Sequence, residues 1–149
     1  MRAIVQRVSS SKVVVDNTVV GKIGKGLNVL LGISVEDNFE DVKYMKDKIV
    51  NLRIFEDQEG KLNKSLKDIN GELIVISQFT LYGDCRKGRR PSFINALSGD
   101  KSEVLYNEFI HLCEDEVDKV EKGIFGADMQ VEIQNDGPVT LLIESKKTF

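Results

Sequence analysis

A predicted buried strand of this chain runs directly into hydrogen-bonding side chains, in the stretch Leu73-Ile74-Val75-Ile76-Ser77-Gln78-Phe79-Thr80-Leu81. The first four residues are apolar and mostly β-branched, which is typical of a strand covered on both faces. The hydroxyl and amide groups that follow would stand at the edge of a sheet, where ligand pockets commonly form. Residue types alone leave two interpretations open here, a ligand pocket and an ordinary strand end followed by a turn.

The chain before this stretch has the pattern of several strands and one helix. Three segments rich in β-branched residues predict strands: 3–8, 12–15 and 18–23. Asp16-Asn17 suits a hairpin turn, and the near-continuous apolar run 27–35 predicts a central strand. A helix is predicted after a cap at Asp37 or Asn38. Its apolar residues recur at helical spacing, at Val42, Met45, Ile49 and Leu52.

The remaining elements complete a mixed α+β pattern. A short strand is predicted over 53–55 and an exposed turn over 56–64. A second helix is predicted from Asp100, as its cap, to Lys122. The last two predicted strands, 128–134 and 139–144, flank the sequence Asn135-Asp136-Gly137-Pro138, which has the composition of a hairpin turn. We expect one domain, 1–149, of two packed, mainly antiparallel β-sheets with two helices on one outer face.

The composition is that of a globular chain. It has 149 residues, of which 41% are hydrophobic and 30% charged, and 21 basic and 24 acidic residues give a net charge of -3. This balance excludes a protein that grips nucleic acid through overall positive charge, although it allows a local basic patch. No segment reaches the roughly 18 apolar residues that span a bilayer, and no secretory signal opens the sequence. We therefore expect a cytoplasmic protein with no membrane partner.

The residues that usually carry hydrolytic or metal chemistry are scarce. Two cysteines and one histidine cannot supply a disulfide framework or a zinc site, so we expect no cofactor and no such metal, while a carboxylate-bound hard cation stays open. His111 falls on the side of the second predicted helix away from its apolar stripe, which favours a solvated residue over a member of a Ser-His-Asp triad. Cys113 lies in that stripe and is expected in the core. Cys85 has cations beside it but no base or resolving cysteine, which disfavours a redox role.

Four motifs of the chain match, in order, those of a known family: Met1-Arg2-Ala3-Ile4-Val5-Gln6-Arg7-Val8, Ser77-Gln78-Phe79-Thr80-Leu81, Gly123-Ile124-Phe125-Gly126-Ala127-Asp128-Met129 and Asn135-Asp136-Gly137-Pro138-Val139-Thr140. On these residues the whole chain resembles the D-aminoacyl-tRNA deacylases. The resemblance implies hydrolysis of the ester that joins a D-amino acid, or glycine, to the terminal adenosine of tRNA. It also implies a homodimer with active sites at the subunit interface, and a cis Gly137-Pro138 bond in a loop that enters the pocket of the other subunit.

The resemblance also implies how the first of these sites would work. The Phe79 backbone N–H and the Ser77-Gln78 region would orient the ester, and Thr80 would line the same pocket. An activated ester needs a positioned water and stabilisation of the developing oxyanion more than a strong nucleophile. A ribose hydroxyl of the substrate would assist, which suits a chain without an obvious protein base. Thr80 as the nucleophile is the lesser option because no activating base accompanies it.

The last motif would distinguish D-amino acids from L-amino acids. If the carbonyls of Gly137-Pro138 face the bound α-carbon, an L side chain collides with fixed backbone and a D side chain points outward. Asn135, Val139 and Thr140 belong to the same substrate-binding and selectivity motif. Arg7 braces the inserted loop in this interpretation, whereas in the plain one it is an ordinary charge on a strand surface.

A basic run follows the central motif and contains four cations: Arg86, Lys87, Arg89 and Arg90. It is either a solvated loop or a surface that contacts the tRNA backbone, since arginine offers paired donors to phosphate. The acidic stretch 114–118 would repel a polyanion. Two other functions stay open: a non-catalytic RNA-binding module of the same fold, and a hydrolase of free D-amino-acid peptides or esters, which would not need the basic run.

Overall fold

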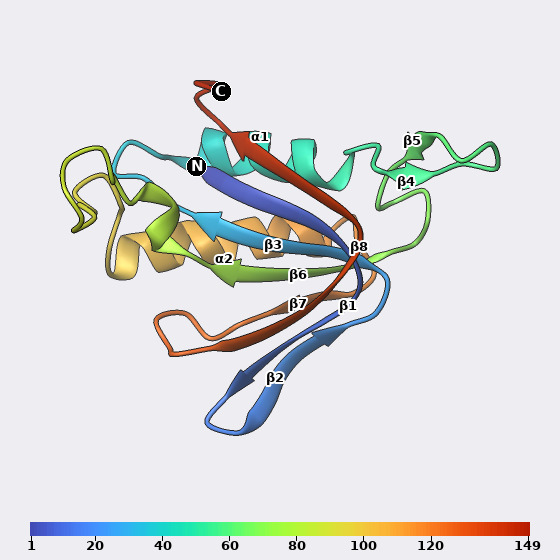
Figure 1. The fold of residues 1–149 in the computed structure, drawn as a ribbon, viewed down its shortest axis with the longest axis horizontal. Coiled ribbons are helices and arrows are strands. Elements are labelled where there is room, and N and C mark those ends of the chain that lie inside the picture. Colours follow the sequence, from blue (N-terminus) through green and yellow to red (C-terminus); the bar gives the residue numbers. More distant parts are fainter.

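The computed structural model describes all residues of the chain, 1–149 (Figure 1). Its strands are β1 (Arg2–Val15), β2 (Thr18–Ile23), β3 (Gly26–Gly32), β4 (Phe55–Glu56), β5 (Leu62–Lys64), β6 (Glu72–Ser77), β7 (Val120–Lys122) and β8 (Gln130–Glu144). Its helices are α1 (Phe39–Val50), α2 (Asp100–Glu114) and the short 3-10 helix η1 (Phe79–Tyr82). Two helices and a mainly antiparallel set of strands confirm the mixed α+β class.

The large sheet is folded over, and the long strands β1 and β8 run through both of its layers (Figure 1). The strand order is β2-β1-β3-β6-β7, with β8 on the other side of β1. The first half of β1 pairs with β3 and its second half, from Ser11, pairs with β2. The predicted pair of packed layers is therefore one hydrogen-bonded sheet, and β4 and β5 form a separate small hairpin.

Strand β6 is buried on both faces, as its apolar run predicts. Leu73 and Val75 belong to the larger core, which both helices cover, and Ile74 and Ile76 belong to a smaller core between the layers of the sheet. Because successive side chains of a strand point to opposite faces, these four residues serve two cores at once. The same double burial makes β3 central, and it pairs with β6 in parallel.

The beginning of the first helix is confirmed, and the extent of the second is not. Asn38 caps α1 and forms a capping box with Asp41. Helix α2 begins after Gly99, not after a side-chain cap at Asp100, and it ends at Glu114. The segment predicted to continue that helix instead forms β7, which pairs in parallel with β6. The free edge of β6 needs backbone partners, which a helix cannot supply because its own N–H and C=O groups are already paired.

The predicted breaks within the terminal strands are also wrong. Residues 3–15 form one strand, β1, and β8 runs without interruption through the segment predicted as a hairpin turn. β8 pairs with β1 on both sides of that segment, where the register shifts twice, between Gln6 and Val8 and between Val8 and Ser10. Residues 136–139 therefore form a bulge along a continuous ladder, because β1 supplies partners to Asn135 and Thr140 on either side of it. The hairpin turn at Asp16-Asn17 is confirmed, with positive φ at both residues.

Candidate active site

The end of β6 delivers the central motif to a bend in the chain. Ser77 is the last residue of the strand, and the Gln78 N–H donates to the Leu31 carbonyl at 2.8 Å, which fixes where the chain leaves the sheet. Helix η1 begins at the next residue. The first N–H groups of any helix have no acceptor within it, so the backbone donors of Phe79 and Thr80 are available to a ligand beside η1.

A pocket of about 640 Å³ opens at this bend. Ser77, Gln78 and Phe79 line it together with Phe93 and with the segments 96–99 and 125–129. Two of the motifs that carry the family resemblance therefore meet here, although some fifty residues separate them in the chain. Sequence reasoning missed the third wall, formed by Phe93 and residues 96–99. The signal for it was two apolar pairs, Phe93-Ile94 and Ala96-Leu97, in a mostly polar loop.

Thr80 lies beside this pocket and is not among the residues that line it. Its hydroxyl accepts a hydrogen bond from the Gln78 side-chain amide. An amide N–H cannot take up the hydroxyl proton, so this partner does not activate Thr80 as a nucleophile. Asp128, which is exposed, is the one ionisable side chain among the lining residues, and sequence reasoning gave it no role.

The Gly137-Pro138 motif lies in the bulge of β8, and its peptide bond is cis, the form that the resemblance implies. Both residues are exposed, as are Asn135 and Thr140, whereas Val139 is half-buried. Gly137 has φ of 125°, and a Cβ there would lie 3.0 Å from the Val139 nitrogen and 3.3 Å from Nη2 of Arg7. Only glycine fits this backbone without strain.

Arg7 anchors the bulge. Its side chain is buried, its Nε donates to the Asp136 carbonyl at 3.1 Å, and it also lies 3.2 Å from the Asp136 carboxylate. Its Nη1 donates to the Ile54 carbonyl at 2.9 Å. Arg7 therefore ties the residue before Gly137 to the segment that leads into β4, and it is not an ordinary charge on a strand surface.

A single chain does not bring the two motifs together. On strand β3, Leu31 pairs with Ser77 at the pocket, whereas Leu27 pairs with Arg7, which contacts the bulge. The pocket and the bulge are therefore separated by four residues along the strand direction. Four residues along a strand correspond to about 13 Å. None of the residues 135–140 lines the pocket at the end of β6.

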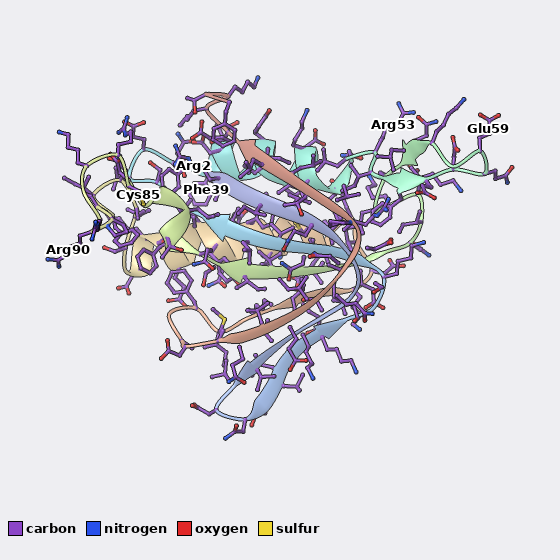
Figure 2. All side chains as sticks on the ribbon, in the orientation of Figure 1. Arg2, Phe39, Arg53, Glu59, Cys85 and Arg90 are labelled. Carbon is purple, nitrogen blue, oxygen red and sulfur yellow. The ribbon has the colours of Figure 1, made fainter.

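The basic run lies in a loop next to η1. Figure 2 shows Cys85 and Arg90 at one end of the molecule, with Arg90 pointing away from its body, and Arg53 and Glu59 at the opposite end. Arg86 forms paired hydrogen bonds with the Asp84 carboxylate, at 2.9 and 2.7 Å, and holds the pKa of that carboxyl well below its ordinary value. The other three cations are exposed and form no salt bridge within the chain.

The remaining candidates have plain structural roles. Cys113 is buried in the core, where burial raises the pKa of its thiol to about 12. His111 and Cys85 are exposed. The chain has no group of three or more His, Cys, Asp or Glu side chains placed to hold a metal ion. None of its helices combines the length and the apolar character needed to cross a membrane.

Comparison with known proteins adds to this geometry. A family model described as D-Tyr-tRNA(Tyr) deacylase matches residues 4–144. Proteins named D-aminoacyl-tRNA deacylase from Clostridium acetobutylicum and Clostridium kluyveri are each 70% identical to this chain over 149 residues, which is 100% of both chains. A solved structure described as c-Myc DNA Unwinding Element Binding Protein matches with a TM-score of 0.92 and 44% identity, over 97% of this chain and 98% of that one.

A second solved structure, described as a probable eukaryotic D-amino acid tRNA deacylase, matches with a TM-score of 0.82. Its identity of 18%, over 95% of this chain and 97% of that one, supports the fold alone. The family model and the full-length relatives are decisive, because their matched ranges include both the pocket and the bulge. This chain belongs to the D-Tyr-tRNA(Tyr) deacylase family.

Proposed function

We propose that the protein hydrolyses the ester bond of D-aminoacyl-tRNA and releases the D-amino acid and free tRNA. The observation that carries this proposal is the pocket at the end of β6, where the Ser77-Gln78-Phe79 motif meets residues 125–129 in a chain of the deacylase family. A volume of about 640 Å³ suits an aminoacyl group with part of the adenosine to which it is attached.

The chemistry requires little from side chains. Water attacks the ester carbonyl, the carbonyl oxygen gains negative charge, and the bond to the ribose oxygen then breaks, with a proton returned to that oxygen. Free backbone N–H groups at the start of η1, with the Ser77 hydroxyl and the Gln78 amide beside them, offer donors for the developing charge. The neighbouring ribose hydroxyl of the substrate assists the transfer of the proton to the leaving ribose oxygen.

Selection of D-amino acids over L-amino acids requires a second subunit. The Gly137-Pro138 bulge lies too far from the pocket of its own chain to act there, so we propose that it enters the pocket of the other subunit in a homodimer. Backbone held against the bound α-carbon excludes an L side chain without contacting a D side chain. Glycine has no side chain to exclude, so glycyl-tRNA is also a substrate.

The exposed cations at residues 87, 89 and 90 contact the tRNA backbone. The protein acts in the cytoplasm, where aminoacyl-tRNA is made and used. The acidic stretch 114–118 lies at the end of α2 and in the turn that follows. Because this stretch repels a polyanion, the contact with tRNA is confined to the basic run.

The test is to incubate the protein with D-tyrosyl-tRNA, L-tyrosyl-tRNA and glycyl-tRNA and to follow release of the amino acid. We expect release from the first and the last and little from the second. Absence of D-selective release from tRNA, with binding to tRNA retained, would favour a non-catalytic RNA-binding module. Equal release from D-tyrosyl-tRNA and from D-tyrosine ethyl ester would favour a hydrolase of free D-amino-acid esters.

A further inference from the structure

The loop between η1 and α2 is held rigidly next to the pocket. Backbone hydrogen bonds between Asp84 and Ser92, at 2.8 and 3.0 Å, close a small hairpin that carries the basic run at its tip. The Val35 N–H then donates to Asn95 at 3.1 Å, and the Leu97 N–H donates to Ile33 at 2.8 Å. The two residues between these anchors, Phe93 and Ile94, are therefore fixed in place.

Phe93 and Ile94 form an apolar surface that leads out of the pocket. The Phe93 ring packs edge-to-face on Phe79, with centroids 5.1 Å apart and planes at 68°, and both rings line the pocket. Ile94 comes next and is 80% exposed, more than any other large hydrophobic residue of the chain. Phe79 and Phe93 are also partly exposed, at 55% and 38%, so Ile94 extends an apolar patch, and such patches mark binding surfaces.

This loop holds cationic and apolar groups close together in the chain. The hairpin with its free cations at Lys87, Arg89 and Arg90 comes first, then Phe93, which lines the pocket, and then the exposed Ile94. Proteins that bind single strands combine aromatic side chains, on which bases stack, with cations that follow the phosphates.

We propose that Ile94 packs against a base of the unpaired nucleotides that precede the terminal adenosine of the substrate RNA, while the tip of the hairpin contacts the phosphates of the same strand. This inference rests on the proposed function, because it takes the ester of that adenosine to lie in the pocket. The bulge of a second copy is proposed to enter the pocket itself, so Ile94, which does not line the pocket, is assigned to the RNA. Three free cations in the same loop, four to seven residues before Ile94, also favour a polyanion.

The experiment compares two substrates that share the reacting ester and differ in the unpaired nucleotides: D-tyrosyl-tRNA and the minimal ester D-tyrosyl-adenosine. Ile94→Ala is expected to raise KM for D-tyrosyl-tRNA about tenfold, as for loss of one stacked base, and to leave kcat unchanged. Ile94→Phe supplies a better stacking surface and is expected to lower that KM. Neither variant should change KM or kcat for the minimal ester.

Leu62→Ala is the matched control, because Leu62 is also an exposed apolar residue, 47% accessible, on the β4–β5 hairpin at the far end of the molecule (Figure 1). An equal change for both substrates, or no change for D-tyrosyl-tRNA, overturns the inference. Dissociation of an oligomer in Ile94→Ala, measured by light scattering, also overturns it and assigns the surface to a second copy. Failure of the unaltered protein to hydrolyse either ester contradicts the proposed function itself.

Discussion

The Nε of Arg7 donates a hydrogen bond to the carbonyl of Asp136 at 3.1 Å and lies 3.2 Å from the carboxylate of the same residue. Asp136 directly precedes Gly137, so a buried side chain of β1 fixes the base of the β8 bulge. The contact joins the first and last long strands of the fold at the first of their two register shifts, between Gln6 and Val8. The guanidinium of Arg7 therefore holds one end of the bulge in place.

Arg7→Ala should loosen the bulge and weaken the fold. It removes the donors to the Ile54 and Asp136 carbonyls, and we expect the free energy of unfolding to fall by about 2 kcal/mol. The ratio of D- to L-tyrosyl-tRNA hydrolysis should fall with it. Urea unfolding and paired deacylation assays measure the two effects. Arg53→Ala, which removes exposed hydrogen bonds to Asn63, is the control and should change neither by much. Unchanged selectivity in a destabilised Arg7→Ala protein would contradict the bracing role.

Gly137→Ala should impair selectivity through the backbone. The new Cβ would lie 3.0 Å from the Val139 nitrogen at a φ of 125°, so the bulge must shift, at a cost of about 1–3 kcal/mol. We expect a loss of D over L discrimination of at least tenfold. Gly60→Ala is the matched control, because Gly60 also has positive φ, at 76°, but a Cβ there meets nothing within 4 Å. We expect a smaller stability loss in Gly60→Ala, which strains φ without a collision, and a loss of selectivity only in Gly137→Ala.

Thr80→Ala should retain deacylation to within about tenfold. The Thr80 hydroxyl lies outside the pocket lining, and its partner, the Gln78 amide, cannot act as a base. The measurement is kcat for D-tyrosyl-tRNA in the Ala and Ser variants. A loss of a thousandfold or more in Thr80→Ala that Thr80→Ser restores would establish Thr80 as the nucleophile instead.

The four cations of the basic run should not be equivalent. Arg86 is engaged with Asp84, whereas Arg89 and Arg90 are free. The double variant Arg89→Ala/Arg90→Ala should weaken tRNA binding and reduce the slope of log K against log salt by about 1 to 2, and Arg86→Ala should have a smaller effect. Binding titrations across a salt series measure both. An unchanged slope in the double variant would exclude the run as a phosphate contact.

Glu116 should make stability depend on pH. Its carboxylate accepts hydrogen bonds from Lys46 of α1 and from Lys67, which hold its pKa below the ordinary value of 4.5. A carboxylate with a lowered pKa in the folded state stabilises the protein fully above its unfolded pKa, and this contribution is lost as pH falls through the folded pKa.

Glu116→Gln should therefore be less stable than the unaltered protein near pH 7 and show a weaker dependence on pH below about 4.5. Urea unfolding at neutral and acidic pH measures the difference. Glu59→Gln, at an exposed ion pair with Lys61, is the control and should follow the unaltered protein. Parallel pH profiles for Glu116→Gln and the unaltered protein would exclude this effect.

Local patterns of the sequence predict several elements correctly. The apolar runs at 27–35 and 73–76 predict β3 and β6, because a strand that is buried on both faces consists of consecutive apolar residues. Asn38 predicts the start of α1 through its own side chain. In these segments the interactions that decide the structure lie within a few residues of each other.

Other elements could not be read locally. Val117 and Val120 continue the helical period of α2, but residues 120–122 form β7 because the edge of β6 lies beside them. The segment Asn135–Pro138 has the composition of a hairpin turn, but the chain does not reverse there because β8 pairs with β1 on either side of the segment. In both segments the deciding hydrogen bonds come from strands far away in the sequence.

The sequence by itself determined the class of the fold, the central strands and, through the motifs at 77–81 and 135–140, the resemblance to a family. Only the tertiary structure decided that Arg7 holds the bulge, that Phe93 completes the pocket, and that the pocket and bulge of one chain lie far apart. The reason is physical, since side-chain patterns record which residues are buried, while the register between distant strands determines which residues meet.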